Sequence, residues 1–471
     1  MADAADEVAR ASSAVTRGDL LKKGTAAAFA VSMFGGLTDR ALGVYGPLKF
    51  AKKELSGELR IMTWAHFVPA YDKWLDGTYA KQWGEANDVE VKIDHINNAL
   101  LYSTGAAEVA AQSGHDLFWF ISPPASFQKQ AIPVTDLVQE VSKKVGRMAR
   151  VARKSTYNPR TKQFYGFPET YAPDPVQYRR SVLQQAGVSL RTWDDLRQGA
   201  PKLKQLGHPV GLGMSNEIDS NMLLTSLLYC YGGYIQNEEN RIVIGQGANR
   251  KGAIQALQVM KDIYANGMSD EVFAWTAASN NQAFLAGRLS VALNAISIVR
   301  SAEDSGNQAL SDDTWLASIP RGPVQRLGNE HVMGVYLIWK FAKNKDAAQK
   351  YVVDQMLNYE DHFVQSKFYN FPPWTNSIEG GFKAIRSLAT KDAHKPKGKY
   401  SILTTIAEKY TTNPGHPGNT TPVMDEIYNT FLIPQMFATV AQGKSTPAEA
   451  VSAFAAKAAS IYRKWHNQKL V

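Results

Sequence analysis

The strongest constraint on the fold is an alternation of strands and helices near the start of the chain. Residues 59–64 and 89–93 alternate apolar and polar side chains as strands do, and residues 71–86 between them have helical spacing. A second helix over 100–112 and a buried strand over 116–121 follow. Strands connected through helices pair in parallel. The pattern therefore predicts the beginning of a doubly wound α/β lobe.

Length and composition predict two such lobes in a globular protein. A chain of 471 residues exceeds a single ordinary core. The 44% hydrophobic and 20% charged residues are typical of a water-soluble protein. The net charge is +9, and residues 1–43 hold five basic and five acidic residues, so the excess lies in the remainder. This balance favours an anionic solute or lipid, or is simply a solvated surface. Without a concentrated basic patch we expect no nucleic-acid partner.

The stretch 166–196 is predicted to cross from one lobe to the other. Pro168, Pro173 and Pro175 exclude a regular helix or a central strand. A strand to position 178 and a helix ending near Gly187 follow, and Thr192 begins another helix through a capping box. No nucleophile, metal cluster or phosphate loop is found here.

Residues 1–43 are predicted to be a cleavable export signal, followed by a linker over 44–56. Arg17, Lys22 and Lys23 precede an apolar run over 25–34 that is too short to span a membrane. The region resembles a twin-arginine signal with Gly18 at the second arginine, which leaves twin-arginine and general export both open. No cysteine follows the run, so we expect a periplasmic or other extracytoplasmic protein without a lipid anchor.

Cysteine and histidine patterns predict neither a metal nor a cofactor. The single cysteine, Cys230, lies in an apolar run and is expected to be a small buried residue. The nine histidines have no metal-ligand spacing.

Several spaced motifs resemble the family 1 extracellular solute-binding proteins of bacterial ABC importers. The crossover carries Gly166, Pro168, Tyr178, the pair 186–187 and the Thr-Trp-Asp-Asp-Leu segment 192–196. Further segments similar to family motifs are 114–119, 131–137, 281–293, 318–320, 334–356 and 443–462.

This resemblance implies a two-lobed periplasmic-binding-protein fold of type II, in which each lobe is a doubly wound sheet flanked by helices and a hinge joins them. The N-terminal lobe is expected to comprise 57–168 and 320–372, and the C-terminal lobe 169–319 and 373–471. The implied function is non-catalytic: a monomer captures a solute by hinge closure and delivers it to the permease of an ABC importer.

Candidate site residues follow from the rule that ligands bind beyond the carboxyl ends of strands in such sheets. The resemblance further gives Trp119 and Tyr428 the role of stacking on a sugar, although the segment 294–297 lacks the tryptophan of the sugar-binding members. The candidate ligand-binding residues are Trp64, His66, Trp119, Phe120, Ser122, Glu169, Tyr171, Asp174, Trp275, Asn294, Ser297, Trp374 and Tyr428. Each of the aromatic residues is equally compatible with a place in the core.

A carbohydrate is the expected solute, because aromatic faces bordered by polar groups suit sugars. A polyol, glycerol phosphate or another small polar solute stays open, as does a solute sensor. A glycoside hydrolase is the rival from another class, with Glu169 paired with Asp174 or Asp425. Replacing Trp119 or Tyr171 by alanine is expected to weaken binding with little effect on folding.

Overall fold

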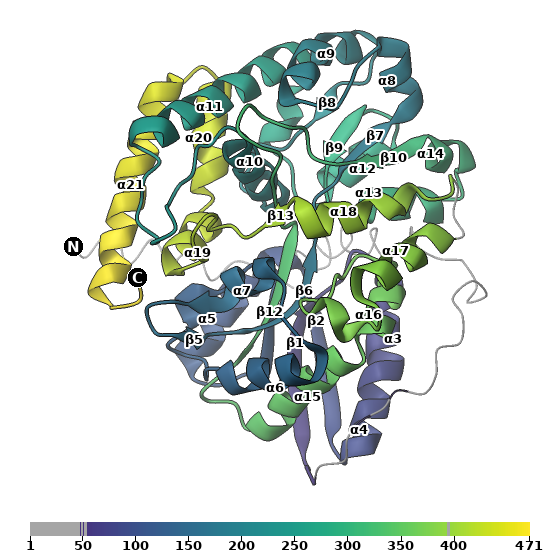
Figure 1. The fold of residues 1–471 in the computed structure, drawn as a ribbon, viewed down its shortest axis with the longest axis vertical. Coiled ribbons are helices and arrows are strands. Elements are labelled where there is room, and N and C mark those ends of the chain that lie inside the picture. Colours follow the sequence, from purple (N-terminus) through teal and green to yellow (C-terminus); the bar gives the residue numbers. More distant parts are fainter. Residues whose placement is uncertain (1–47, 49, 51–53, 393–395) are drawn as a thin grey trace, which may run out of the picture.

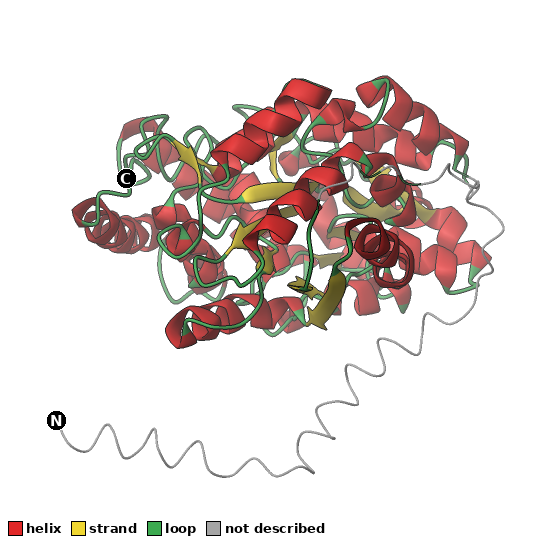
Figure 2. Cartoon of the chain, turned by 90° about the horizontal axis from the view of Figure 1, so that it is seen from below, coloured by secondary structure: helices red, strands yellow, loops and turns green. Residues whose placement is uncertain are grey.

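The chain was analysed as a computed structural model that describes residues 48, 50, 54–392 and 396–471. It is an α/β protein of two lobes, each built around a mixed β-sheet (Figure 1). Seen from below, the strands lie inside a layer of helices (Figure 2). The predicted export signal lies outside the described residues, as does most of the predicted linker.

The first lobe contains a five-stranded sheet in the order β2-β1-β3-β12-β6. Its strands are β1 (Glu58–Trp64), β2 (Glu90–Ile96), β3 (Leu117–Phe120), β6 (Phe167–Ala172) and β12 (Val332–Ile338). β1 pairs in parallel with β2 and β3, which confirms the predicted parallel start. β12 is antiparallel to β3 and β6, so the chain returns to this lobe late and places a strand between two earlier ones.

Helices cover both faces of this sheet (Figure 1). The helices before β6 and those from β12 to position 409 are α3 (Pro69–Trp74), η1 (Leu75–Ala80), α4 (Lys81–Asn87), η2 (Asn98–Leu100), α5 (Leu101–Ala111), η3 (Ala125–Phe127), α6 (Thr135–Val145), α7 (Arg150–Thr156), α15 (Lys345–Leu357), α16 (Tyr359–Gln365), η5 (Thr375–Ser377), α17 (Gly381–Lys391), η6 (Lys399–Ser401) and α18 (Ile402–Lys409). The last of these, α18, lies beside α13 (Ser297–Asp304) of the second lobe in Figure 1. The predicted helix over 71–86 is present, with a π-helical turn at η1. The turn leaves Tyr79 and Trp83 both packed against Tyr351 of α15.

The second lobe contains a four-stranded sheet in the order β10-β7-β9-β8. Its strands are β7 (Val176–Arg179), β8 (Val210–Gly211), β9 (Val291–Leu293) and β10 (Thr314–Ala317). Its helices are α8 (Arg180–Ala186), α9 (Trp193–Gln205), α10 (Ile218–Cys230), α11 (Gly247–Gly267), η4 (Asp270–Phe273), α12 (Ser279–Leu285), α13 (Ser297–Asp304), α14 (Gln308–Asp313), α19 (Pro422–Asn429), α20 (Leu432–Ala441) and α21 (Pro447–Asn467). Two small pairs, β4 (Tyr157–Asn158) with β5 (Gln163–Phe164) and β11 (Gly328–Asn329) with β13 (Thr411–Thr412), complete the strands.

Local signals in the crossover stretch have the predicted structural effects. Pro168 lies in β6 at the edge of the sheet, beside a bulge at Glu169 of the same strand, where a missing N–H is tolerated. Gly187 ends α8 in the left-handed conformation, at φ 63°. Thr192 and Asp195 form a reciprocal capping box at the start of α9, and Trp193 is fully buried.

Two hydrophobic clusters correspond to the two sheets. The first collects residues around β1, β3, β6 and β12, and the second collects residues around β7 to β9 and α10. Side chains between positions 374 and 407 pack in the first cluster. The boundaries expected for the two lobes, including the one after residue 372, stay predictions. Cys230 is buried in the second cluster, as predicted.

Polar contacts connect the lobes along one side of the molecule. The Ser126 N–H donates to Asp425 Oδ2 at 2.7 Å, the Thr420 N–H donates to the Lys154 carbonyl at 2.8 Å, and Asn158 Nδ2 donates to the Leu470 carbonyl at 3.0 Å. The lobes are therefore held against each other in this conformation. Among the described residues no helix has both the length and the apolar character needed to cross a membrane.

Candidate binding site between the lobes

Two tryptophans from neighbouring strands of the first lobe stack on each other. Trp64 ends β1 and Trp119 lies in β3, and their rings are 5.2 Å apart and inclined by only 9°. Gly334 in β12 makes room for this pair, because a Cβ there would lie 2.7 Å from the Trp119 indole nitrogen. The sheet thus positions a flat aromatic surface that no larger residue at 334 would allow.

Glu169 holds Trp119 in this orientation. The Trp119 indole N–H donates to Glu169 Oε2 at 3.2 Å, and Gln355 Nε2 donates to Glu169 Oε1 at 3.0 Å. Burial raises the pKa of Glu169 to about 8, although the Trp119 hydrogen bond acts in the opposite direction. Both oxygens of this candidate residue are therefore engaged inside the first lobe.

His66 and Tyr369 extend the aromatic surface. His66 Nδ1 accepts from the Val68 N–H at 2.8 Å, so Nε2 carries the proton and donates to Asn370 Oδ1 at 3.2 Å. Burial lowers the pKa of His66 to about 4, so its ring is neutral. The Tyr369 ring lies 4.9 Å from His66 and 6.1 Å from Trp64. We call Trp64, His66, Trp119 and Tyr369 the aromatic group.

A histidine between two aspartates lies where the chain crosses between the lobes. Asp174 follows β6, His331 precedes β12 and Asp219 belongs to α10 of the second lobe. His331 Nδ1 lies 3.1 Å from Asp174 Oδ1, and its Nε2 lies 3.5 Å from Asp219 Oδ1. Burial lowers the pKa of His331, but the negative charges of Asp219 and Asp174 outweigh it and raise the pKa above its usual value. We call these three residues the acidic group.

Amide side chains fix the orientation of Asp219. Its Oδ2 accepts from Asn280 Nδ2 at 2.7 Å and from Asn294 Nδ2 at 3.2 Å. The Ser297 hydroxyl in turn donates to Asn294 Oδ1 at 2.8 Å. Asn294 and Ser297 were both predicted as site residues. Asn294 donates to the carboxylate of Asp219, which was not predicted, and Ser297 holds Asn294 in place.

The aromatic and acidic groups meet at Tyr369. Burial raises the pKa of the Tyr369 hydroxyl, and the negative charges of Asp219 and Asp174 raise it further. The charge of Asp174 also contributes to the raised pKa of Tyr428 in α19, after burial and the charge of Glu330. The Tyr428 hydroxyl donates to Thr225 Oγ1 at 2.8 Å. Side chains of both lobes thus converge on one buried region.

Four of the predicted residues make no hydrogen bond or ring contact with the two groups among the described residues. Phe120 packs against Phe118 and Phe127. The remaining three are Trp374, which donates to Ser142 Oγ inside the first lobe, Trp275, which packs in the second cluster, and Ser122, which is half-buried.

Tyr171 is a buried edge residue of the first sheet. Its backbone exchanges two hydrogen bonds with Phe371, and the two rings lie 5.9 Å apart. Tyr171 and Trp119 are 1% and 2% exposed. This burial contradicts the expectation that either can be replaced by alanine with little effect on folding, because such a truncation leaves a large cavity.

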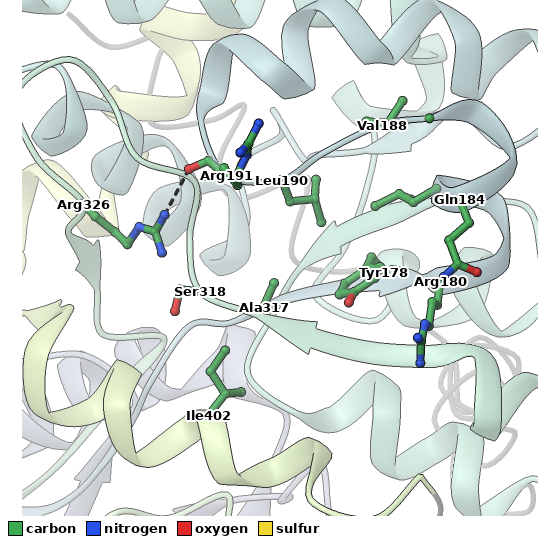
Figure 3. Close-up of a pocket in the computed structure, with 12 residues that line it drawn as sticks. Tyr178, Arg180, Gln184, Val188, Leu190, Arg191, Ala317, Ser318, Arg326 and Ile402 are labelled. Atoms are coloured by element: carbon green, nitrogen blue, oxygen red, sulfur yellow. Dashed lines mark hydrogen bonds between the residues drawn. The ribbon is translucent and has the colours of Figure 1, made fainter.

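A surface pocket of about 500 Å³ lies apart from these groups (Figure 3). Tyr178, Arg180, Arg191, Arg326 and Ile402 are among its lining residues, and the Arg326 guanidinium donates to the Arg191 carbonyl at 3.0 Å. None of the predicted site residues lines it.

His331 and Asp219 are the members of the two groups that the sequence analysis did not select, whereas Tyr369 was noted near a crossover. The available signal for Asp219 was a set of polar residues at the start of the apolar run that forms α10. His331 carries no comparable signal, because its role depends on two carboxylates far away in the sequence. In the part of the chain that the structure describes, no three His, Cys, Asp or Glu side chains are grouped to hold a metal ion.

Solved structures with the same fold include three solute-binding proteins. A sugar transporter from Arthrobacter chlorophenolicus A6 with bound laminaribiose is 18% identical, with 87% of this chain and 99% of that chain covered and a TM-score of 0.65. The GacH receptor of Streptomyces glaucescens GLA.O, studied unliganded and with acarbose, is 16% identical over 87% and 99%, with a TM-score of 0.69. An ABC transporter solute-binding protein from Agrobacterium radiobacter K84 in complex with ribitol is 15% identical over 86% and 98%, with a TM-score of 0.64.

These similarities confirm the predicted two-lobed periplasmic-binding-protein fold. Among curated protein sequences, none matches this chain. A family match covers residues 78–384, which span β3, β6, β7, β9 and β12 and therefore the strands of both lobes. The family is described as bacterial extracellular solute-binding protein, and this chain belongs to it.

Proposed function

We propose that the protein captures a carbohydrate between its lobes. The observation that carries this proposal is the stacked pair Trp64 and Trp119 with the ring of Tyr369 beside it, whose pKa is raised by burial and by the charges of Asp219 and Asp174. Sugars present apolar C–H faces and polar rims, so a flat aromatic surface beside carboxylate and amide groups fits them. The sugars bound by two of the similar structures, laminaribiose and acarbose, support this class of solute.

Capture by hinge closure follows from the family and from the position of the site. The aromatic group belongs to the first lobe, whereas Asp219 and Tyr428 belong to the second. Separation of the lobes would divide the site, and closure on a solute would complete it. A monomer that closes in this way presents one conformation to the permease of an ABC importer, to which we propose it delivers the solute.

A polyol is the second candidate, because the similar structure from Agrobacterium radiobacter K84 binds ribitol. A solute sensor with the same fold would differ from a transport protein only in its partner, because a receptor and not a permease would bind the closed form. A glycoside hydrolase has less support, because two of the carboxylates that it would use are hydrogen-bonded to neighbouring residues. Glu169 is engaged by Trp119 and Gln355, and Asp425 accepts from Ser126 and Asn429.

The test is native mass spectrometry of the protein purified without added solute, followed by denaturation to release what is bound. A released sugar mass, together with thermal stabilisation by that sugar, is the expected result. A released polyol would favour the second candidate. Hydrolysis of a glycan by the pure protein, or no stabilisation by any sugar or polyol, would contradict the proposal.

We also propose that the protein is exported with cleavage near residue 43 and without a lipid anchor. Membership of an extracellular family supports export. Cell fractionation and N-terminal sequencing of the mature protein test this. An intact N-terminus on cytoplasmic protein would contradict it, and the dependence on a twin-arginine or a general translocase would identify the route.

A further inference from the structure

Three buried oxygens of Asp174, Asp219 and Tyr369 make no hydrogen bond within the described residues. These residues are 3%, 6% and 1% exposed. Asp174 Oδ2 and the Tyr369 hydroxyl have no hydrogen-bond partner there, and Asp219 Oδ1 has an ionic partner in His331 Nε2, 3.5 Å away, but no hydrogen bond. Buried polar atoms are nearly always paired, because an unpaired one loses its hydration without compensation. These three oxygens point to a ligand that supplies hydrogen-bond donors.

The charge around these oxygens is negative. Within the described residues, His331 is the only basic side chain in an ion pair with Asp174 or Asp219, so one imidazolium faces two carboxylates. Glu217, at the start of the same helix as Asp219, accepts from the Asp219 N–H at 2.7 Å and the Ser220 N–H at 2.6 Å, but burial raises its pKa to about 8, so it adds little negative charge near neutral pH. An anion placed here would meet uncompensated negative charge in a poorly screened interior.

We propose that this site selects hydroxylated solutes that carry no phosphate or carboxylate group, and that Asp174 and Asp219 accept hydrogens from the solute. This rests on the proposed function and narrows its solute class. Solute hydroxyl or ammonium hydrogens satisfy the two carboxylate oxygens, whereas a phosphate or carboxylate brings further acceptors and a like charge. Glycerol phosphate and sugar acids are therefore excluded.

The basic balance of the chain does not oppose this selectivity. Three arginines that contribute to it, Arg180, Arg191 and Arg326, line the surface pocket of Figure 3 and not the buried site. The Arg180 guanidinium lies over the Trp315 ring at 4.8 Å, and the Arg326 guanidinium lies over the Tyr410 ring at 5.6 Å. These arginines thus contribute to the net charge of +9 at the surface, whereas the acidic group gives the buried site its negative charge.

The first experiment compares matched solutes on the wild-type protein. Glucose, tagatose, maltose, laminaribiose and ribitol are screened by thermal shift. The strongest binder is then compared by calorimetry with its amino, phosphorylated and uronic or aldonic acid derivatives. We expect the uncharged and amino forms to bind and the anionic forms to bind at least about 100-fold more weakly, as expected for a buried like charge.

Two failures are distinguishable. If no sugar or polyol binds, the proposed function is wrong and this inference falls with it. If an anionic derivative binds as tightly as its uncharged parent, the protein remains a solute-binding protein and only the inferred selectivity is wrong.

The second experiment changes the carboxylates themselves. Asp174→Asn and Asp219→Asn should each weaken binding of the uncharged solute by about tenfold or more, the usual effect of losing a charged acceptor. They should also reduce the ratio of affinities between uncharged and anionic forms, which a general loss of packing would not change. Asp354→Asn is the matched control, because Asp354 is buried inside the first lobe with Trp83 and Lys350 as partners.

Circular dichroism establishes that each variant is folded. An unchanged affinity ratio in folded Asp174→Asn and Asp219→Asn protein would overturn the inference. If either variant does not fold, the other variant and the wild-type comparison still decide it.

Discussion

The aromatic and acidic groups border the same buried site but are built in different ways. In the aromatic group, His66 and Trp119 have their ring nitrogens hydrogen-bonded within the first lobe. In the acidic group, His331 connects Asp174 to Asp219 of the second lobe, and Asp174 Oδ2 has no hydrogen-bond partner among the described residues. The first is formed by one lobe alone, whereas the second requires the lobes to be together.

This difference separates two contributions to binding. A surface that is already packed and hydrogen-bonded is preorganised, so a solute that stacks on it loses little free energy in ordering the protein. Buried acceptors that lack partners instead penalise any solute that does not satisfy them, and so provide discrimination. The predictions below test whether stability depends mainly on the aromatic group and selectivity mainly on the acidic group.

The largest expected loss of stability is for Trp119→Ala. Removing a fully buried indole leaves a cavity between Trp64 and Glu169, and such truncations cost about 3–5 kcal/mol. Urea denaturation should show a correspondingly lower midpoint. Trp119→Phe keeps a ring but loses the donor to Glu169, and should fall between the wild type and the alanine variant. Equal stability of Trp119→Ala and wild type would show that the stack does not support the fold.

A smaller loss is expected for Gly334→Ala. The added methyl group would approach the Trp119 indole and Thr170 to 2.7 Å, and overpacking of this kind costs about 1–3 kcal/mol. Gly77→Ala is the control, because a Cβ at 77 has no neighbour within 4 Å. Denaturation of both variants in parallel checks the difference. A destabilisation as large for Gly77→Ala as for Gly334→Ala would refute the steric explanation.

Glu169 should make stability depend on pH. Its native pKa of about 8 lies above the usual value for a glutamate, so the native state binds the proton more tightly than the unfolded state. The contribution of protonated Glu169 to the free energy of unfolding is complete below the pKa that this residue has in the unfolded chain. It is lost as the pH rises through the native pKa of about 8. Unfolding free energies measured from pH about 5 to about 9 should fall in the wild type and fall less in Glu169→Gln. Parallel curves would show that Glu169 is not the titrating group.

The smallest effects on stability are expected for two hydroxyl deletions. Tyr428→Phe removes a hydrogen bond to Thr225 and should cost about 1 kcal/mol. Tyr369→Phe removes a buried hydroxyl that has no partner among the described residues, so stability should stay the same or rise. Solute affinity of the Tyr369→Phe protein should nevertheless fall. A large loss of stability in Tyr369→Phe would place its hydroxyl in the structure of the lobe and not in the site.

Much of the fold could be predicted because its signals are local. The alternation in β1 and the capping box at Thr192 each depend on residues within one segment, and the structure contains both. The π-helical turn at η1 was not predictable in this way. Its pattern is that of an ordinary helix, and the packing of Tyr79 against α15 is not visible in the sequence.

The candidate site could be predicted only in part, for the same physical reason. Trp64 and Trp119 follow from strand ends and from a family resemblance. Asp219 and His331 gain their importance from a contact between residues 112 positions apart, and no local pattern encodes that distance. Conversely, Phe120 was selected because it ends a strand, yet the alternation of β3 directs its ring into the packing around Phe127.

The near-parallel stack of Trp64 and Trp119 also gives the molecule an optical reporter. Two indole rings that are stacked 5.2 Å apart in nearly parallel planes couple their electronic transitions. The pair therefore contributes to the ultraviolet circular dichroism in a way that single tryptophans do not. A solute that approaches either ring alters that coupling. At the site that we propose, solute binding can therefore be followed on unlabelled protein, and the Trp119→Phe spectrum identifies which part of the signal belongs to the pair.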